Sequence, residues 1–310
     1  MRLSKELWRD SRVFFWALFP VLCFCLCANP SWAGFSDLLN GATDSVLPGR
    51  AGSAIKAAVA FGKSFQDISP EQEYYIGRAV TANVVSTYPP SQNDRFNLYL
   101  NTLGQTLAMA SDRPETFGGY HFLMLDSAEI NAFAAPGGLI LVTRGMVSLC
   151  KTEDALAAVL AHEISHVQGQ HGLKSIKNSR LTSAFTITAT EAAKSYGPVQ
   201  ISKLTEVFQG SITDITTTLM KSGYSRDLER EADKGAVTIL GRVGYDPAAL
   251  IVMLTEMKKQ LKPGGLDFAK THPDPKDRIE DIRPLVGSGL SIAPVSPERR
   301  KRFEAAMTNL

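Results

Sequence analysis

The segment AVLAHEISHVQGQH, residues 158–171, contains the residue types that a metal-dependent hydrolase needs. His162 and His166 are four positions apart, so on a helix both rings project from one side and can bind the same ion. Glu163 stands next to the first histidine, where its carboxylate can take a proton from a water that the ion activates. A catalytic zinc ion has three protein ligands and one open position. The pattern therefore predicts a zinc hydrolase and leaves the third ligand to be found.

His171 is the nearest candidate for that third ligand, and its spacing argues against it. In the metzincin pattern the last histidine would fall at position 172, which is glycine here. A shift of one residue turns a helical side chain by about 100°, so we expect His171 on the surface or behind a ligand. The thermolysin-like set of two histidines and one glutamate needs an acid farther along. Glu191, the nearest acid, stands out of place for it.

The segment SRDLEREAD, residues 225–233, supplies a stronger candidate. Glu229 and Asp233 are four positions apart and share one face of a predicted helix. Glu229 can bind the ion, and Asp233 can accept the N–H of a ligating histidine and fix its orientation. Glu231 points elsewhere and is expected to be solvated. Without the upstream histidines, the same residues would indicate an exposed helix face with local arginine pairs.

Hydrophobic periodicity and capping residues predict mostly helical segments around these residues. Helices are expected over 69–85, 94–111, 152–172, 227–244 and 246–261, a turn leading into a short helix over 271–285, and strands over 120–125 and 137–145. Ser69 and Thr152 are N-cap candidates, and Gly172 can end the third helix. One face of that helix should meet the core through Leu156, Leu160, Ile164 and Val167. The Ser/Thr-rich segment 173–222 is helix or loop, and its relation to the cleft stays open.

This pattern predicts an α+β fold, a mostly helical zincin-type metallopeptidase domain with a small β-sheet beside the active-site helix. The expected organisation is a signal peptide at 1–33, an N-terminal arm at 34–68, the zinc metallopeptidase domain at 69–290 and a basic tail or helix at 291–310. The run RRKR, residues 299–302, is expected to be a solvated helix face.

The N-terminus has the order of a secretory signal: a basic start, an apolar run at 13–27, and small residues before Gly34. An uncleaved anchor is the alternative, although the run is short for a span of about 20 residues. We therefore expect an exported, periplasmic protein. Large residues precede Cys23, Cys25 and Cys27, so lipidation is not expected, and the mature chain keeps only Cys150.

The remaining chain has equal numbers of acidic and basic residues once residues 1–33 are set aside. It therefore has no overall basic field that would attract nucleic acid. Peripheral membrane contact stays open. An exported chain without a disulfide must be stabilised by its core and, by this hypothesis, a metal.

Four segments in order resemble the HtpX-like and CAAX-protease-like zinc metalloendopeptidases, a gluzincin family, and above all its exported, periplasmic BepA-like members. They are EINAFAAPGGLILVTRGMV, EDALAAVLAHEISHVQGQH, SRDLEREADKGAV and THPDPKDRI, and the resemblance covers about residues 70–285. It implies one zinc ion per chain. The matching ligands are His162, His166 and Glu229, with Glu163 as general base and Asp233 as the supporting acid.

The same resemblance implies a substrate strand and a further histidine near the metal. The run from Asn131 to Val142 resembles the strand beside the active-site cleft, where an edge strand can pair with an extended peptide. Its residues of interest are Asn131, Ala132, Phe133, Pro136, Gly137 and Gly138. His272 either donates to the developing oxyanion or binds zinc as a fourth ligand and keeps the enzyme latent. Arg278 matches a companion basic residue.

The leading hypothesis is an endopeptidase of the bacterial cell envelope that cuts misfolded or unassembled envelope proteins, with outer-membrane assembly machinery as a candidate partner. A second hypothesis is a chaperone-like client-binding or assembly factor whose zinc site is latent. A third is a structural metal protein with four fixed ligands. The presence of Glu163 argues against the third, because a structural zinc site needs no general base.

Overall fold

The computed structural model describes residues 68–176, 198–260, 271–286, 296–308 and 310. They form an α+β fold, mostly helical with one small sheet, as the sequence predicts. The elements are α4 (Pro70–Thr87), α5 (Asp94–Ala108), β1 (His121–Leu125), β2 (Ala132–Ala135), η1 (Pro136–Gly138), β3 (Leu139–Thr143), α6 (Arg144–Leu149), α7 (Glu153–Gln168), α8 (His171–Lys174), α10 (Pro198–Thr217), η2 (Thr218–Ser222), α11 (Arg226–Val243), α12 (Ala248–Gln260), α13 (Pro275–Val286) and α14 (Pro297–Met307).

The sheet has the strand order β1-β3-β2, with β1 parallel and β2 antiparallel to the central strand β3. Its side chains alternate between two cores because successive residues of a strand point to opposite faces. The face toward α7 carries Phe122, Met124, Ala132, Ala134, Ile140 and Val142. The other face carries Leu125, Phe133, Ala135 and Leu141.

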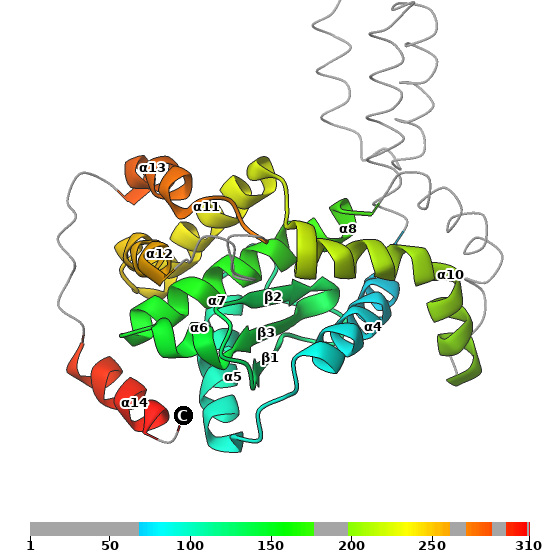
Figure 1. The fold of residues 1–310 in the computed structure, drawn as a ribbon, viewed down its shortest axis with the longest axis horizontal. Helices are drawn as coiled ribbons and strands as arrows, with labels where there is room; N and C mark the ends of the chain where they lie inside the picture. Colours follow the sequence, from blue (N-terminus) through cyan, green and yellow to red (C-terminus); the bar gives the residue numbers. More distant parts are fainter. Residues whose placement is uncertain (1–67, 177–197, 261–270, 287–295, 309) are drawn as a thin grey trace, which may run out of the picture. The chain divides into compact units, whose positions relative to one another are not determined.

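Helices cover both faces of this sheet (Figure 1). On one side α7 packs against β2 and β3, and α5, α11 and α12 surround α7. On the other side α4 contacts β2 and β3, and α10 packs along α4. The helix with the two histidines thus lies between the sheet and the outer helices, and it is buried from Glu153 to Val167.

The end of α7 differs from the prediction. Thr152 caps its start as expected, with its hydroxyl accepting from the Ala155 N–H, but the helix ends at Gln168 and not at Gly172. Gln170 has a left-handed backbone, with φ of 52°, which breaks the helix and starts α8. The chain therefore turns before His171, and this changes where the His171 side chain lies.

The run from Asn131 to Val142 is not one strand, which corrects the expectation for the substrate strand. Pro136 has no N–H for a ladder, and Gly137 and Gly138 have φ of 77° and 98°, a region that favours glycine. The three residues form η1, a tight turn that joins β2 to β3. β2 is the edge strand of the described sheet, as expected, but it is short.

The basic run 299–302 lies on an exposed helix face, but two of its arginines also pair with buried acids, so the prediction of a merely solvated face is incomplete. Arg302 Nε donates to Glu153 Oε2 at 2.6 Å, and Glu153 is fully buried at the start of α7. Arg299 Nη1 donates to Asp154 Oδ1 at 3.0 Å. The two arginines therefore hold α14 against the first turn of α7, while the other two basic residues are exposed.

Several expectations fall outside the described residues: the signal peptide at 1–33, nearly all of the arm at 34–68, residues 287–295 and much of the segment 173–222. Within the described ranges, no helix combines the length and apolar composition that crossing a bilayer requires. Cys150 is buried, with its thiol donating to the Met146 carbonyl at 3.3 Å.

The turn η1 is held by α4 at very close range. A Cβ added to Gly77 would lie 1.8 Å from the Pro136 carbonyl oxygen. Buried Glu73, on the same helix, accepts from the Gly137 N–H at 3.3 Å and pairs with Arg113 at 2.6 Å. The β2–β3 turn can therefore lie this close to α4 only because residue 77 is a glycine.

We predict that Gly77→Ala destabilises the protein by about 3 kcal/mol, because backbone atoms of Pro136 cannot yield to the new methyl group. Gly241→Ala is the matched control on another helix, where no described atom lies within 4 Å. It should stabilise the fold by about 0.5–1 kcal/mol. Urea unfolding followed by circular dichroism checks both values. Equal stability of the two variants would contradict the close approach of α4 and η1.

Candidate metal centre

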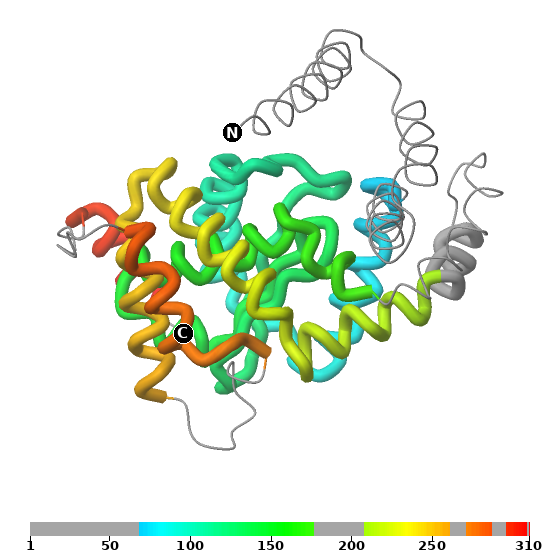
Figure 2. The backbone as a smooth tube through the Cα atoms, turned by 90° about the horizontal axis from the view of Figure 1, so that it is seen from above, coloured from blue at the N-terminus to red at the C-terminus, as the bar shows by residue number. Residues whose placement is uncertain are grey.

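Four segments bring the candidate residues together. Figure 2 shows α11, in yellow, running beside α7, in green. The contributions are His162, Glu163 and His166 from α7, Glu229 and Asp233 from α11, His272 from the turn before α13, and Arg278 from α13. All seven side chains are buried. The close crossing depends on small residues, because a Cβ at Gly235 would lie 2.6 Å from Ser165 Oγ.

His162, His166, Glu229 and His272 each offer one nitrogen or oxygen atom as a metal ligand, and these four atoms lie within 4.8 Å of one another. The two Nε2 atoms on α7 are 3.1 Å apart. Glu229 Oε2 is 3.6 Å from His162 Nε2, and Glu229 Oε1 is 3.5 Å from His166 Nε2. These three residues are the three predicted ligands, so the structure brings the whole predicted set to one point.

This donor set fits a zinc ion. Zinc–nitrogen and zinc–oxygen bonds of about 2.0–2.2 Å in a tetrahedron separate the donors by roughly 3.3–3.5 Å, close to the spacings above. Two imidazoles and one carboxylate are also the ligand set of many catalytic zinc sites. A carboxylate buried among three imidazoles would be costly without a nearby cation.

His162 has its outer nitrogen fixed by an acid. His162 Nδ1 lies 2.9 Å from Asp233 Oδ1, so its Nε2 is directed to the cluster. Burial and the Arg278 guanidinium lower the pKa of His162, but the contacts with Asp233 and Glu229 outweigh them and raise that pKa to about 9. Arg278 in turn donates to both oxygens of Asp233, at 2.6 and 2.9 Å. Asp233 therefore stands where the sequence predicts it, and Arg278 lies behind it.

His166 is held in the same way by His171. The two Nδ1 atoms are 2.8 Å apart, and His171 Nε2 lies 3.4 Å from Glu231 Oε2. His171 is fully buried, so of its two expected locations the surface is wrong and the position behind a ligand is confirmed. It does not belong to the four-donor cluster. Glu231 is half-exposed, as expected, yet it contacts His171.

His272 contacts the carboxylate of the cluster. Its Nδ1 lies 2.9 and 2.8 Å from the two oxygens of Glu229. Its ring centre is 5.4 Å from that of His162 and 5.9 Å from that of His166. Burial lowers the pKa of His272 despite the Glu229 charge, so the ring has a neutral nitrogen able to bind a metal.

Glu163 is buried beside the cluster without joining it. Its Oε1 has no hydrogen-bond partner among the described residues. Burial raises the pKa of this carboxyl to about 7, an effect that the Glu229 charge reinforces and the His162 charge opposes. A carboxylate with a pKa near neutrality and a free oxygen is suited to take up a proton.

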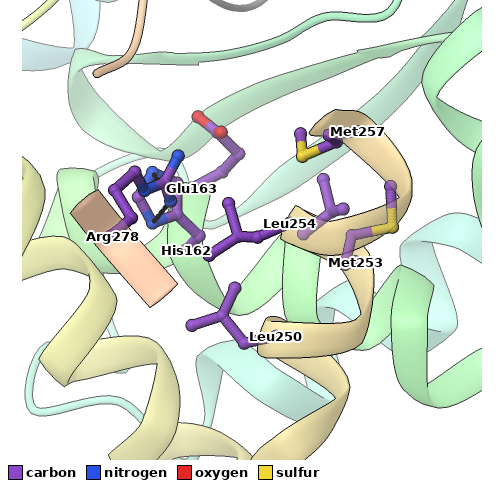
Figure 3. A pocket seen from close by; sticks show the side chains of 8 residues that line it. His162, Glu163, Leu250, Met253, Leu254, Met257 and Arg278 are labelled. Carbon is purple, nitrogen blue, oxygen red and sulfur yellow. Dashed lines mark hydrogen bonds between the residues drawn. The ribbon is translucent and has the colours of Figure 1, made fainter. Parts of the chain in front are cut away.

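An apolar hollow opens beside Glu163 (Figure 3). It is small and partly open to solvent, with room for about one water molecule. Its walls are Val159, His162, Glu163, Leu250, Met253, Leu254, Met257 and Arg278. No sequence pattern indicates this hollow, because the apolar face of α12 looks like any buried helix face until its position over α7 is known.

The predicted substrate-strand residues are divided among the residue before β2, β2 itself and η1. Asn131 precedes β2, and its Oδ1 is 3.5 Å from the Thr271 hydroxyl, next to His272. Ala132 and Phe133 are in β2, whereas the Pro-Gly-Gly residues form η1. Tyr224, whose ring stacks on His166 with centres 4.4 Å apart, was not predicted as a site residue. A single tyrosine before a helix cap gives no periodic signal.

Comparison with known proteins agrees with this geometry. The sequence model of peptidase family M48 matches residues 94–286, more than half of the chain and all of the candidate site. The chain therefore belongs to peptidase family M48, and the predicted resemblance to a zinc metallopeptidase family is confirmed.

The curated relatives are proteases. A putative beta-barrel assembly-enhancing protease of Vibrio cholerae is 28% identical over 219 residues, 69% of this chain and 44% of that protein. The beta-barrel assembly-enhancing protease of Escherichia coli K12 is 26% identical over 223 residues, 70% of this chain and 44% of that protein. The mitochondrial metalloendopeptidase OMA1 of Schizosaccharomyces pombe is 28% identical over 225 residues, 71% of this chain and 63% of that protein. The chain thus spans less than half the length of the first two.

We predict that His171→Ala lowers zinc affinity by about 10–100-fold, because His166 loses the contact that orients its ring. His121→Ala is the matched control, since His121 is exposed and its ring bonds, among the described residues, to the Gly118 carbonyl at 2.8 Å. Competition with a chromophoric zinc chelator measures both affinities. Equal affinity of the two variants would show that His171 does not position His166.

Proposed function

We propose that this member of peptidase family M48 is a zinc-dependent endopeptidase of the cell envelope that hydrolyses misfolded or unassembled proteins. One observation carries the proposal: the free oxygen of buried Glu163 lies beside a cluster of donors spaced for one zinc ion. A structural metal site would need the cluster but not the neighbouring base.

In this proposal His162, His166 and Glu229 hold the ion. Zinc, when bound, lowers the pKa of a water and polarises the carbonyl that the water attacks. Glu163 takes the proton of that water and passes it to the leaving amide nitrogen. Asp233 keeps the Nε2 of His162 directed to the ion. Arg278 acts on Asp233 rather than on the substrate, since its Nε and Nη2 both donate to that carboxylate.

Two features beside the cluster support a peptide as substrate. β2 is an edge strand of the described sheet and its four residues are buried, so an extended chain would add to it through backbone hydrogen bonds once the site opens, with little demand on sequence. The hollow beside Glu163 is walled by leucine and methionine side chains of α12. We therefore propose that a residue next to the cut bond is apolar, which unfolded proteins expose and folded ones bury.

His272 makes the site self-inhibited in this proposal. It is the fourth donor of the cluster, and a fourth protein ligand would take the position that a water needs. Its contact with both Glu229 oxygens supports a closed arrangement. Substrate or a partner would then displace the His272 segment and open the site.

The same closed arrangement favours a second candidate function. A chain whose zinc site stays latent would hold clients along β2 and act as a chaperone-like or assembly factor. Glu163 distinguishes the two functions, because hydrolysis needs its carboxylate and client binding does not.

The cellular setting is part of the proposal. The N-terminal pattern of basic, apolar and small residues indicates export to the periplasm by a cleaved signal peptide. Two relatives are named for beta-barrel assembly, which supports envelope proteins as substrates and outer-membrane assembly machinery as a partner. The balanced charge argues against nucleic acid, and peripheral membrane contact is compatible with the proposal.

We predict that Glu163→Gln reduces cleavage of unfolded casein by at least about 100-fold, because the amide cannot take up the proton. Glu115→Gln, which changes an exposed glutamate away from the site, should cleave like the parent chain. Gel electrophoresis of timed digests measures the rates. Undiminished cleavage by Glu163→Gln would contradict the proposal. If neither chain cleaves and both still suppress aggregation of an unfolded client, the second candidate function is correct.

We predict that His272→Ala raises the rate of casein cleavage, by up to about tenfold if only a tenth of the protein is open at any time. Thr271→Ser, one residue away, keeps the hydroxyl that faces Asn131 and should leave the rate unchanged. Zinc content is measured beside the rate, because a loss of metal would mask the release. A rate that is unchanged or lower at full zinc content would exclude the latch.

A further inference from the structure

We propose that Tyr224 is a catalytic residue whose phenol O–H donates a hydrogen bond to the oxygen of the carbonyl under attack. The proposal rests on the function above and adds the group that stabilises the developing negative charge. That group is a separate requirement from the base, because peptide hydrolysis needs both an acceptor for the water proton and a donor to the oxyanion.

The ring of Tyr224 is fixed against the candidate metal ligands. It lies between η2 and the Ser225 cap of α11 and stacks on the His166 ring, with centres 4.4 Å apart and planes 20° apart. It also contacts the His171 ring edge to face, with ring centres 5.9 Å apart. The phenol is thus held by packing, which is the condition for a donor that must be in position before the charge develops.

The hydroxyl of Tyr224 is buried and has no hydrogen-bond partner among the residues that the structure describes. A buried hydroxyl without a partner destabilises the folded state, and such groups in native proteins call for an explanation. Glu163 Oε1 is a second such atom in the same site. The Tyr224 hydroxyl can donate to the oxyanion and the Glu163 oxygen can accept the water proton, which are the two functions that amide hydrolysis requires.

The other candidate donors are already engaged. His272 Nδ1 contacts both oxygens of Glu229, and Arg278 donates to both oxygens of Asp233. The remaining guanidinium nitrogen, Arg278 Nη1, lies 3.8 Å from Glu229 Oε2, so turning either group to the substrate would weaken a contact with a buried carboxylate. Tyr224 gains a partner and gives up none of its described hydrogen bonds.

The surroundings keep the phenol in its donating form. Burial, and then the carboxylates of Glu163 and Glu229, hold the pKa of Tyr224 well above its ordinary value. The hydroxyl is therefore kept in its protonated form. The stacking of the ring on His166, with centres 4.4 Å apart, places the phenol beside a candidate metal ligand.

The test is Tyr224→Phe, which keeps the ring against His166 and removes only the hydroxyl. We expect kcat for an internally quenched peptide to fall by about 100–1,000-fold, as for loss of one oxyanion donor. KM and zinc content should change by less than about threefold. Tyr88→Phe is the matched control, since it also removes only a phenol hydroxyl, a partly buried one that donates to Glu129 at 2.8 Å away from the cluster. Its kcat should not change.

A binding measurement keeps the test decisive if turnover is slow. A phosphinic peptide has a tetrahedral oxyanion at the position of the cut bond, whereas the matching amide peptide does not. Tyr224→Phe should weaken binding of the phosphinic peptide by about 100-fold and leave the amide peptide unaffected. Equal losses for both peptides, or kcat within about threefold of the parent, would overturn the role of Tyr224. Cleavage that is independent of Glu163 would overturn the proposed function itself.

Discussion

A carboxylate and three imidazoles buried within one small cluster are the constraint on which the rest of the molecule depends. Burial of Glu229 removes its hydration, and each buried charge needs compensation by a cation or by protons held on its neighbours. The contacts behind the cluster supply part of that compensation: Asp233 and Arg278 on one side, and His171 on the other. The cluster can form only because α7 and α11 cross closely at Ser165 and Gly235.

The remaining architecture keeps these two helices in place. The sheet supports α7 from one side, and α12 covers it from the other. The arginines of α14 fix the first turn of α7 through Glu153, at the end opposite the histidines. Burial raises the pKa of Glu153, but the Arg302 pair and the hydrogen bonds from Tyr245 and Tyr99 outweigh it and lower that pKa. A long buried helix anchored at its start gives the rigidity that a fixed set of ligands requires.

The parts of the site that depend on local spacing could be predicted from the sequence. His162 and His166, and then Glu229 and Asp233, are pairs one helical turn apart, so each pair shares a face whatever the fold does elsewhere. The position of the His171 side chain could not be predicted from spacing alone. A continuing helix would turn it away, but the chain breaks at Gln170 and turns back, and the side chain reaches His166 from behind.

Other features depended on tertiary contacts that no local pattern carries. β2 reads AFAA and has weak strand propensity, so its pairing with β3 decides its conformation. Arg302 reads as a surface charge until Glu153 is found beneath it. Tyr224 has no periodic partner, and the hollow over Glu163 exists only because α12 lies across α7.

Zinc K-edge X-ray absorption of the zinc-loaded chain tests the central claim, a single ion at the cluster of His162, His166 and Glu229, most directly. The account predicts one zinc per chain with only nitrogen and oxygen ligands at about 2.0–2.2 Å, at least two of them imidazoles. In Glu229→Gln the same spectrum should change or vanish. A sulfur ligand at about 2.3 Å, or a spectrum that Glu229→Gln leaves unchanged, would contradict the account.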